Sequence, residues 1–206
     1  MTDAFAALAQ LGTATVHEAA ARSPVVDADL IQVVPGSRAA GPARTVRCGQ
    51  DDNLMVHAAV AEAQPGEVLV LTMPEPTPIA LIGELIATQA KTSGVAAILV
   101  DGAVRDLDEL RELGLPVWAR FVRVSGAEKQ VRGEIGGTVK VGGATIRQGD
   151  VVVLDADGAV VVERERIEEV LAAAKQRFER EQEKRPKLQA GAFSYDLDGL
   201  RRLLES

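Results

Sequence analysis

The sequence predicts a mixed α/β fold in which a parallel sheet covered by helices adjoins an antiparallel β section. Residues 68–71 and 95–100 are unbroken apolar runs, which are typical of strands buried on both faces. Strand and helix signals alternate over residues 68–120, and this order predicts parallel pairing through right-handed crossovers. Short apolar segments separated by tight turns between residues 139 and 162 predict antiparallel hairpins. We therefore expect mixed sheets and helices arranged in layers.

Glycine and proline divide the first part of the chain into short elements, since both residues favour turns. Gly12 ends the first expected helix, Pro65-Gly66 ends the third, and Gly94 directly precedes the second buried strand. Asp101-Gly102 is expected to end that strand. The helices expected in this part lie at residues 2–10, 13–21, 53–63, 78–92 and 107–113, and the strands lie at residues 30–34, 43–48, 68–71, 95–100 and 117–120.

The last part of the chain changes character twice. Four short strands are expected at residues 139–141, 144–146, 151–154 and 159–162. A long charged helix then begins at Ile167 and runs to about Arg185. Its end has too few apolar side chains to be buried, so it is either a solvated face or a strut that reaches a neighbouring subunit. We expect one domain over residues 1–206, with a C-terminal helical extension from about residue 164 to residue 206.

Composition excludes several classes of protein. The chain has 206 residues, of which 47% are hydrophobic and 26% charged, as in ordinary globular domains. The net charge is −7 and only 3% of residues are aromatic, so neither broad phosphate-backbone binding nor base stacking is expected. The apolar runs are too short to cross a membrane. A small carboxylated ligand stays possible, provided that a local basic group anchors it.

Cysteine use and the first residues indicate the compartment. Cys48 is the single cysteine, so an internal disulfide cannot form, which fits a reducing cytoplasm. No basic and apolar leader opens the sequence, and we expect no secretory signal. We therefore expect a cytoplasmic protein.

A candidate site follows the strand expected at residues 95–100. Arg105 and Asp106 come just after it, and in open α/β sheets ligands bind beyond the carboxyl ends of the strands. Arginine can bind a carboxylate bidentately, and aspartate can hold a hard divalent cation such as Mg²⁺ together with waters. Gly83-Glu84 lies in the first turns of the helix expected at residues 78–92, and backbone amides near the start of a helix can hold an anion. These residue types suit a 2-oxo acid chelated to a metal; a salt bridge or a helix cap is the alternative role of the pair.

The histidines and the cysteine favour structural roles. His57 lies one helical turn after Asn53, and a structural hydrogen bond is its expected role. His17 is expected on a helix surface, and Cys48 in a packed strand. No Cys/His cluster has the spacing of a zinc site.

Gly83-Glu84, twenty further residues and Arg105-Asp106 resemble the D-x20-R-D signature of the RraA-like family. Within that family the chain is similar to the 4-hydroxy-4-methyl-2-oxoglutarate / 4-carboxy-4-hydroxy-2-oxoadipate aldolases. Glu84 stands where those aldolases usually have Asp. The other stretches that carry the resemblance are residues 13–19 (TATVHEA), Asp52-Asn53 with His57, residues 116–118 (PVW), 148–153 (QGDVVV), 155–160 (DADGAV) and 183–191 (EKR, KL and Gly).

The resemblance implies a fold and an activity. The family fold is a three-layer β/β/α swivelling domain, assembled as a homotrimer or as a hexamer that is a dimer of trimers. The implied activity is that of a class II, metal-dependent pyruvate aldolase of aromatic catabolism, which cleaves either hydroxy-oxo acid to pyruvate and a 2-oxo acid. An oxaloacetate decarboxylase side activity is expected, because loss of CO₂ also leaves pyruvate enolate. Nucleic acid and membrane are not expected partners.

The resemblance also implies roles for the residues of the signature. Asp106 would coordinate Mg²⁺ or Mn²⁺ directly. Arg105 would bind the pyruvyl group and stabilise the developing enolate. Glu84 would hold a water of the metal and help to position the base.

Five more residues receive roles in the same way. Gly83 and the backbone amides of Leu85 and Ile86 would hold the substrate carboxylate. Glu18 and Glu181 would contribute acidic groups to the metal-water shell of a neighbouring subunit.

Two other functions stay open. One is a non-catalytic protein that binds and regulates the RNA-degradation machinery, as the shorter relatives suggest; it needs an interaction surface and no active site. The other is a decarboxylase or lyase that acts on a different 2-oxo acid through the same metal and arginine.

Overall fold

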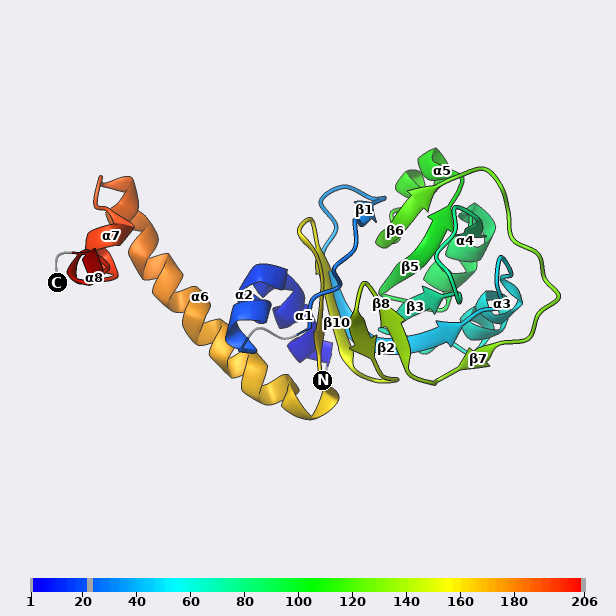
Figure 1. The fold of residues 1–206 in the computed structure, drawn as a ribbon, viewed down its shortest axis with the longest axis horizontal. Coiled ribbons are helices and arrows are strands. Elements are labelled where there is room, and N and C mark those ends of the chain that lie inside the picture. Colours follow the sequence, from blue (N-terminus) through cyan, green and yellow to red (C-terminus); the bar gives the residue numbers. More distant parts are fainter. Residues whose placement is uncertain (1, 22–23, 205–206) are drawn as a thin grey trace.

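Residues 2–21 and 24–204 are described by the structure, a computed structural model, and they form layers of strands and helices (Figure 1). The strands of the large mixed sheet lie in the order β1-β6-β5-β3-β2-β10-β11, with β4 beside β5 and β7 beside β2. Strands β8 and β9 pair with each other in a small second sheet. The strand bounds are β1 Ile31–Gln32, β2 Ala39–Arg47, β3 Val68–Thr72, β4 Ala80–Ile82, β5 Ala97–Val104, β6 Val117–Val122, β7 Glu134–Ile135, β8 Val139–Val141, β9 Ala144–Ile146, β10 Val151–Asp155 and β11 Gly158–Val162.

The helices alternate with strands in the first two thirds of the chain and then follow one another at its end. Their bounds are α1 Thr2–Leu11, α2 Thr13–Ala19, α3 Leu54–Ala61, α4 Glu84–Thr92, α5 Leu107–Leu113, α6 Ile167–Gln189, α7 Ser194–Leu197 and α8 Arg201–Leu204, with a short 3-10 helix at Arg164–Arg166 before α6. Within the described residues, no helix is both long enough and apolar enough to cross a bilayer.

The central strands bury both faces, as their unbroken apolar sequences predict. In β3, Leu69 and Leu71 pack in the cluster that contains α3, α4 and α5, whereas Val68 and Val70 pack against β8, β9 and β10. This alternation follows from the two-residue period of a strand. The layers are therefore the helices α3–α5, the parallel strands β3, β5 and β6, and the antiparallel strands β8–β11. The three-layer β/β/α fold and the parallel pairing over residues 68–120 are confirmed.

Strand β2 joins the parallel and antiparallel parts. Its residues 39–42 pair antiparallel with β10, and its residues 43–47 pair parallel with β3. The strand expected at residues 43–48 begins earlier, at Ala39, so Pro42 lies inside it, opposite Val151. Proline has no N–H to donate, and it lies here at the point where the strand changes partner.

Two other boundaries differ from the sequence prediction. Residues 80–82 form β4, which pairs parallel with β5, and the helix expected from residue 78 begins only at Glu84. Strand β5 continues through Asp101-Gly102 to Val104. The Asp101 carboxylate is buried but forms an ion pair with Arg120 of β6, so the strand can continue without an unpaired charge in its interior.

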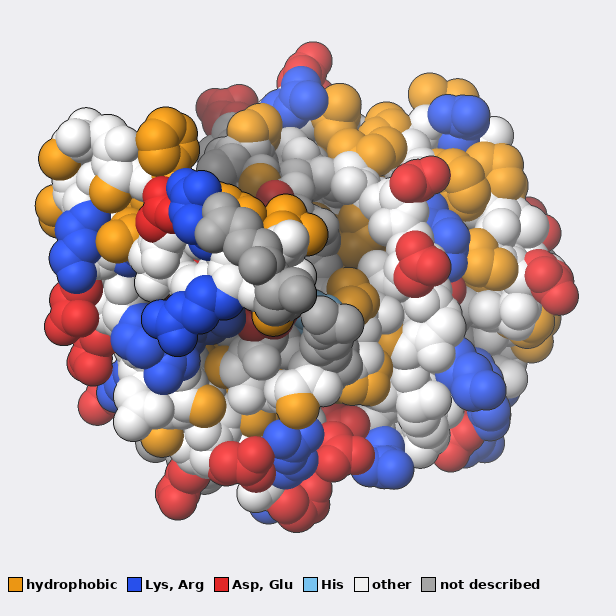
Figure 2. All heavy atoms as spheres, turned by 60° about the vertical axis from the view of Figure 1, so that its left-hand side comes forward, with side chains coloured by type: hydrophobic (Ala, Val, Ile, Leu, Met, Phe, Trp, Pro, Cys, Tyr) orange, Lys and Arg blue, Asp and Glu red, His pale blue; other side chains and the backbone are white. Residues whose placement is uncertain are grey.

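The N-terminal helices and the first part of α6 cover the outer face of β10 and β11. Leu8, Val16 and Val170 are buried there against valines of the two strands. Helix α6 then extends away from the sheet, with α7 and α8 at its far end (Figure 1). Hydrophobic side chains are interspersed with acidic and basic ones on the face where these helices come forward (Figure 2). The large exposed apolar side chains of the extension are Phe178, Leu188, Phe193, Leu197, Leu200, Leu203 and Leu204.

Candidate active site

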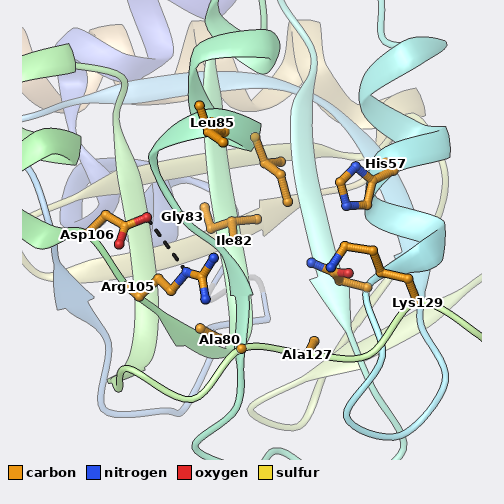
Figure 3. Close-up of a pocket in the computed structure, with 12 residues that line it drawn as sticks. His57, Ala80, Ile82, Gly83, Leu85, Arg105, Asp106, Ala127 and Lys129 are labelled. Atoms are coloured by element: carbon orange, nitrogen blue, oxygen red, sulfur yellow. Dashed lines mark ion pairs between the residues drawn. The ribbon is translucent and has the colours of Figure 1, made fainter.

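A cavity of about 240 Å³ lies beyond the carboxyl ends of β2, β4, β5 and β6 (Figure 3). It is smaller than the roughly 300–1,000 Å³ of pockets that hold drug-sized ligands, so it suits a small metabolite. The residues that line it are Asn53, His57, Ala80, Ile82, Gly83, Leu85, Ile86, Arg105, Asp106, Gly126, Ala127 and Lys129.

Arg105 and Asp106 form one wall of the cavity. Asp106 Oδ2 accepts a hydrogen bond from the backbone N–H of Glu84 at 3.0 Å, and Arg105 Nε lies 3.7 Å from the same oxygen. The side chains are 49% and 40% exposed, so both are accessible to a ligand. Asp106 adopts a left-handed backbone conformation, with φ 59° and ψ 51°. The pair therefore forms a salt bridge, which was one of its alternative roles, and also faces the cavity.

Glycines at two positions make room for this pair. A Cβ atom on Gly83 would lie 2.3 Å from Asp106 Oδ2. A Cβ atom on Gly126 would lie 2.7 Å from Arg105 Nη1. Both distances are shorter than van der Waals contact. A side chain at residue 83 would displace Asp106 and crowd Arg105, whereas one at residue 126 would meet only the flexible end of Arg105.

The first turn of α4 supplies free backbone donors. The Ala87 N–H begins the helical ladder by donating to the Gly83 carbonyl at 3.1 Å, whereas the N–H groups of Leu85 and Ile86 find no backbone acceptor among the described residues. Both residues line the cavity. Free N–H groups and the helix dipole at such a terminus favour an anion.

Glu84 is placed differently from its neighbours. Its backbone N–H contacts Asp106, but its carboxylate accepts a hydrogen bond from the Thr88 hydroxyl at 2.7 Å, one turn along α4. Glu84 is not among the residues that line the cavity. The carboxylate thus lies beside the cavity and is directed along the helix.

Glu18 and Glu181 lie outside the cavity of their own chain. Glu18 is exposed on α2, and the Glu181 carboxylate on α6 lies 3.0 Å from Arg177 Nε. Helices α2 and α6 are at the opposite end of the molecule from α4 and α5 (Figure 1). A single chain therefore does not bring these two carboxylates to Arg105 and Asp106.

The sequence prediction missed three residues on the other side of the cavity. Asn53 and His57 lie at the start of α3, and Lys129 lies on the segment that follows β6. Figure 3 shows His57 and Lys129 across the cavity from Arg105 and Asp106. The buried Nε2 of His57 has no hydrogen-bond partner among the described residues, so it does not make the structural hydrogen bond expected of this side chain. The signal available in the sequence was the Asn-x-x-x-His spacing, which places both side chains on one helix face.

Asp52 fixes the segment that carries Lys129. Asp52 is 1% exposed, and its Oδ2 accepts hydrogen bonds from the N–H groups of Gln130 at 2.6 Å and Val131 at 3.0 Å. Its Oδ1 accepts a third from Leu54 at 2.8 Å. Burial alone raises the pKa of this carboxyl, but the three N–H groups and the Lys129 charge outweigh burial, and the pKa is lowered from 3.8.

The charges around the cavity differ from those of the whole chain. Two basic side chains, Arg105 and Lys129, and one carboxylate, Asp106, line it, although the chain carries a net charge of −7. This is the local basic anchor that an anionic ligand requires. An arginine, a carboxylate and free helix amides at the strand ends thus form a site whose donors and charges suit a small anionic ligand.

The family of this protein follows from sequence comparison. The RraA-like family model (Aldolase/RraA) matches residues 13–161, and the chain belongs to this family. A protein of Halalkalibacterium halodurans, provisionally named a 4-hydroxy-4-methyl-2-oxoglutarate aldolase, is 39% identical over 137 residues. The match covers 66% of this chain and 65% of that protein, which is slightly less than two thirds of its length.

Solved structures agree at the level of the fold. A Streptomyces coelicolor protein described as an unusual member of the RNase ES inhibitor RraA family has a TM-score of 0.79 and 29% identity, covering 89% of this chain and 96% of that chain. A Thermus protein described as the RNA-processing inhibitor RraA has a TM-score of 0.68 and 28% identity, covering 73% and 91%. The family match ends at residue 161, so α6, α7 and α8 lie beyond it.

Proposed function

We propose that this protein is a class II, metal-dependent pyruvate aldolase that cleaves 4-hydroxy-4-methyl-2-oxoglutarate or 4-carboxy-4-hydroxy-2-oxoadipate to pyruvate and a second 2-oxo acid. The observation that carries the proposal is the meeting of Arg105, Asp106 and the free amides of Leu85 and Ile86 in one small cavity. The family model and the name of the Halalkalibacterium relative support it.

The residues of the cavity suit a hard divalent cation, Mg²⁺ or Mn²⁺. Asp106 Oδ2 is held by the Glu84 N–H, while Oδ1 has no hydrogen bond or ion pair with the described residues. One or two protein carboxylates with waters and substrate oxygens are the usual donors to Mg²⁺. Zinc fits less well, because no group of three or more His, Cys, Asp or Glu side chains comes together in the described part of the chain. When bound, the cation supplies Lewis-acid stabilisation of charge on the 2-oxo oxygen.

Arg105 and the helix amides hold the pyruvyl half of the substrate. The C1 carboxylate accepts hydrogen bonds from the Leu85 and Ile86 N–H groups, where the helix dipole favours an anion. The Arg105 guanidinium faces the 2-oxo oxygen and stabilises the negative charge that develops there as the enolate forms. Donors aimed at developing charge of this kind contribute roughly 10²–10³-fold each to kcat.

Cleavage breaks the C3–C4 bond; the 4-hydroxyl gives up a proton, and C3 later gains one. The 4-hydroxyl loses its proton, its O–H electrons form the new carbonyl at C4, and the C3–C4 bond electrons form pyruvate enolate. Protonation at C3 then releases pyruvate. We assign Glu84, with Glu18 and Glu181 of a neighbouring subunit, to positioning the water that accepts the hydroxyl proton. The same electron sink decarboxylates oxaloacetate, because loss of CO₂ leaves the same enolate.

The assignment of Glu18 and Glu181 requires an oligomer. Both carboxylates lie at the far end of their own chain from the cavity, so only another copy could bring them to Arg105 and Asp106. We propose a homotrimer or a dimer of trimers, in which α2 and α6 of one copy approach the cavity of the next.

Pyruvate release tests the aldolase directly. Purified protein, Mg²⁺ and 4-hydroxy-4-methyl-2-oxoglutarate are mixed, and pyruvate is followed through a coupled lactate dehydrogenase. The expected result is release that stops when a chelator is added. Release of pyruvate from oxaloacetate alone would support the enolate chemistry of the site but would show that the natural substrate is a different 2-oxo acid. Absence of pyruvate from both, with Mn²⁺ binding shown by calorimetry, would contradict the aldolase.

A second candidate function is a protein that binds and regulates a ribonuclease. The observation that favours it is the likeness to two structures described as RraA inhibitors. Such a regulator uses its surface, so Arg105→Ala would leave partner binding unchanged. In an aldolase the same change would remove pyruvate release. Co-purification with an endoribonuclease and no pyruvate release would favour the regulator.

A further inference from the structure

We infer that Asn53, His57 and Lys129 form a distal polar subsite that binds the hydroxyl and the second carboxylate of the substrate. This inference rests on the proposed function and deepens it, because it names the part of the substrate that the far wall of the cavity recognises. The three residues line the same cavity as Arg105 and Asp106. Figure 3 shows His57 and Lys129 across the cavity from that pair.

Unpartnered polar atoms mark this wall as a binding surface. In the described part of the chain, three buried side-chain polar atoms lack a hydrogen-bond partner: Asn53 Oδ1, His57 Nε2 and Arg177 Nε. Arg177 Nε still lies 3.0 Å from the Glu181 carboxylate. The two atoms left without any polar partner therefore belong to residues of one cavity. Buried polar groups are nearly always paired in proteins, and a ligand in the cavity supplies the missing partners.

The orientation of Asn53 is fixed by its other contacts. Its Nδ2 donates to the Leu81 carbonyl at 2.9 Å, and its backbone N–H donates to the Glu128 carbonyl at 2.9 Å. Only the amide nitrogen can donate to a carbonyl, so the oxygen Oδ1 is the atom left free. Asn53 is 5% exposed, so it cannot turn away into solvent. A free acceptor in this position selects a donor on the ligand, and a hydroxyl is the donor that a hydroxy-oxo acid carries.

His57 and Lys129 supply donors beside that acceptor. The Nε2–H tautomer of His57 donates one hydrogen bond, and the Lys129 ammonium donates up to three and carries a full positive charge. Asp52 holds the amides of Gln130 and Val131, and this anchor places Lys129 at the cavity. Donors with a positive charge select a carboxylate.

The two ends of the cavity match the two ends of the proposed substrate. The pyruvyl end meets Arg105, Asp106 and the amides of α4. The 4-hydroxyl and a distal carboxylate, which is C5 in 4-hydroxy-4-methyl-2-oxoglutarate, then meet Asn53 Oδ1 and the donors of His57 and Lys129. The subsite thus selects 2-oxo acids with a distal carboxylate over chains of the same length without one.

Binding of non-cleavable analogues tests the subsite. 2-Oxoglutarate has the five-carbon chain with a distal carboxylate but no 4-hydroxyl, so it cannot undergo the aldol cleavage; 2-oxopentanoate lacks the distal carboxylate as well. Calorimetry with Mg²⁺ and the intact oligomer should show that the wild type prefers 2-oxoglutarate by about 10-fold or more. Lys129→Met and His57→Leu should each reduce this preference, with a larger loss of affinity for 2-oxoglutarate than for pyruvate. Lys140→Met, an exposed lysine of β8, is the matched control.

The melting temperature of His57→Leu is a second readout, and it distinguishes a binding role of His57 from a purely structural one. Because His57 Nε2 has no partner, His57→Leu should leave the melting temperature unchanged or raise it while it weakens 2-oxoglutarate binding. A melting temperature that falls with unaltered ligand preference would show a structural role and overturn the subsite. Equal affinity of the wild type for the two analogues would also overturn it. A wild type that prefers 2-oxoglutarate but releases no pyruvate from 4-hydroxy-4-methyl-2-oxoglutarate would support the subsite while the aldolase proposal fails.

Discussion

Asp106 Oδ2 and the backbone nitrogen of Glu84, which are 22 residues apart in sequence, lie 3.0 Å apart across the cavity wall. This hydrogen bond ties the turn between β5 and α5 to the turn between β4 and α4. The carboxylate proposed to hold the cation and the helix that offers free amides are therefore fixed relative to each other. A small displacement of either turn would misalign both ends of the pyruvyl site, and a misplacement of ~1 Å can cost ~10²-fold in rate.

Asp106→Asn should remove metal-dependent activity without unfolding the protein. Asparagine tolerates the left-handed conformation of this residue, φ 59°, and its Oδ1 can still accept the Glu84 N–H. The lost negative charge should lower Mn²⁺ affinity and pyruvate release by more than the ~10–100-fold that loss of an outer partner of a metal ligand costs. Calorimetry with Mn²⁺ and the coupled pyruvate assay measure both effects. Wild-type metal affinity in this variant would contradict the assignment of Asp106.

Gly83→Ala should reduce activity because the new methyl group cannot fit. Its Cβ would lie 2.3 Å from Asp106 Oδ2 and 3.1 Å from Arg105 Nε, so both functional side chains would have to move. We expect a loss of about 10²-fold or more in kcat/KM for pyruvate release. Gly114→Ala is the control. Its φ of 72° makes alanine cost about 1–2 kcal/mol of stability, but the added Cβ meets no atom within 4 Å and lies outside the cavity. Equal activity of Gly83→Ala and the wild type would be evidence against the pyruvyl site.

Arg105→Lys should show whether stabilisation of the enolate needs the two-pronged hydrogen bonding of the guanidinium or only its positive charge. Lysine keeps the positive charge but cannot make two parallel hydrogen bonds to the substrate oxygens. We expect exchange of the C3 protons of pyruvate, followed by NMR in D₂O, to slow by about 10²-fold or more. Arg123→Lys is the matched control, because Arg123 is exposed and, among the described residues, its side chain donates only to the Val122 carbonyl. Exchange at the wild-type rate in Arg105→Lys would show that groups other than the guanidinium fork stabilise the negative charge of the enolate.

The fold was predictable where local pattern and burial agree. The runs at residues 68–71 and 95–100 bury both faces of β3 and β5, and each became a central parallel strand. The prediction failed at residues 80–82, where a short apolar run fits a buried helix turn as well as a strand. Pairing with β5 decides between them, and that contact is tertiary. The continuation of β5 through Asp101 likewise depends on Arg120 of β6, which no local pattern reveals.

The site was predictable on one side of the cavity and not on the other. Arg105, Asp106 and Gly83 come from two turns that follow neighbouring strands, so the rule for ligand sites in parallel sheets applies to them. Lys129 lies in an irregular segment, and long-range hydrogen bonds hold that segment at the cavity, among them those of Asp52 to residues 130 and 131 and that of Asn53 to Glu128. The sequence alone contains no such contact information. For His57 the helical spacing with Asn53 was visible, but its lack of a partner is seen only in the folded chain.

Cys48 should not react with thiol reagents in the native protein. Burial, with a smaller effect of the Asp52 charge, raises the pKa of the Cys48 thiol to about 12, and the residue is 2% exposed. Only the thiolate is nucleophilic, so at pH 8 reaction with a disulfide reagent should be very slow. In denaturant the single thiol of each chain should react fully. Rapid labelling of the folded protein at pH 8 would contradict the packing of Cys48 in the core.

Asp52→Asn should destabilise the protein and loosen the segment that carries Lys129. The side-chain amide would place an N–H₂ group against backbone N–H donors that Asp52 now satisfies, at a cost of about 1–3 kcal/mol in the free energy of unfolding. Urea unfolding at pH 7 measures this cost. Asp108→Asn is the control: its side chain is 95% exposed and pairs only with Arg111 on the surface, so its effect should be small.

The cost of Asp52→Asn should also depend on pH, with a sign that follows from the direction of the pKa shift. Because the folded pKa of Asp52 is lowered from 3.8, ionised Asp52 contributes stability that is present above pH 3.8 and is lost as pH falls below that value through the folded pKa. The difference in unfolding free energy between wild type and Asp52→Asn should therefore be largest near pH 7 and should shrink in urea titrations at pH 3. A difference that stays constant from pH 7 to pH 3 would show that the three N–H groups do not bind the ionised carboxylate preferentially.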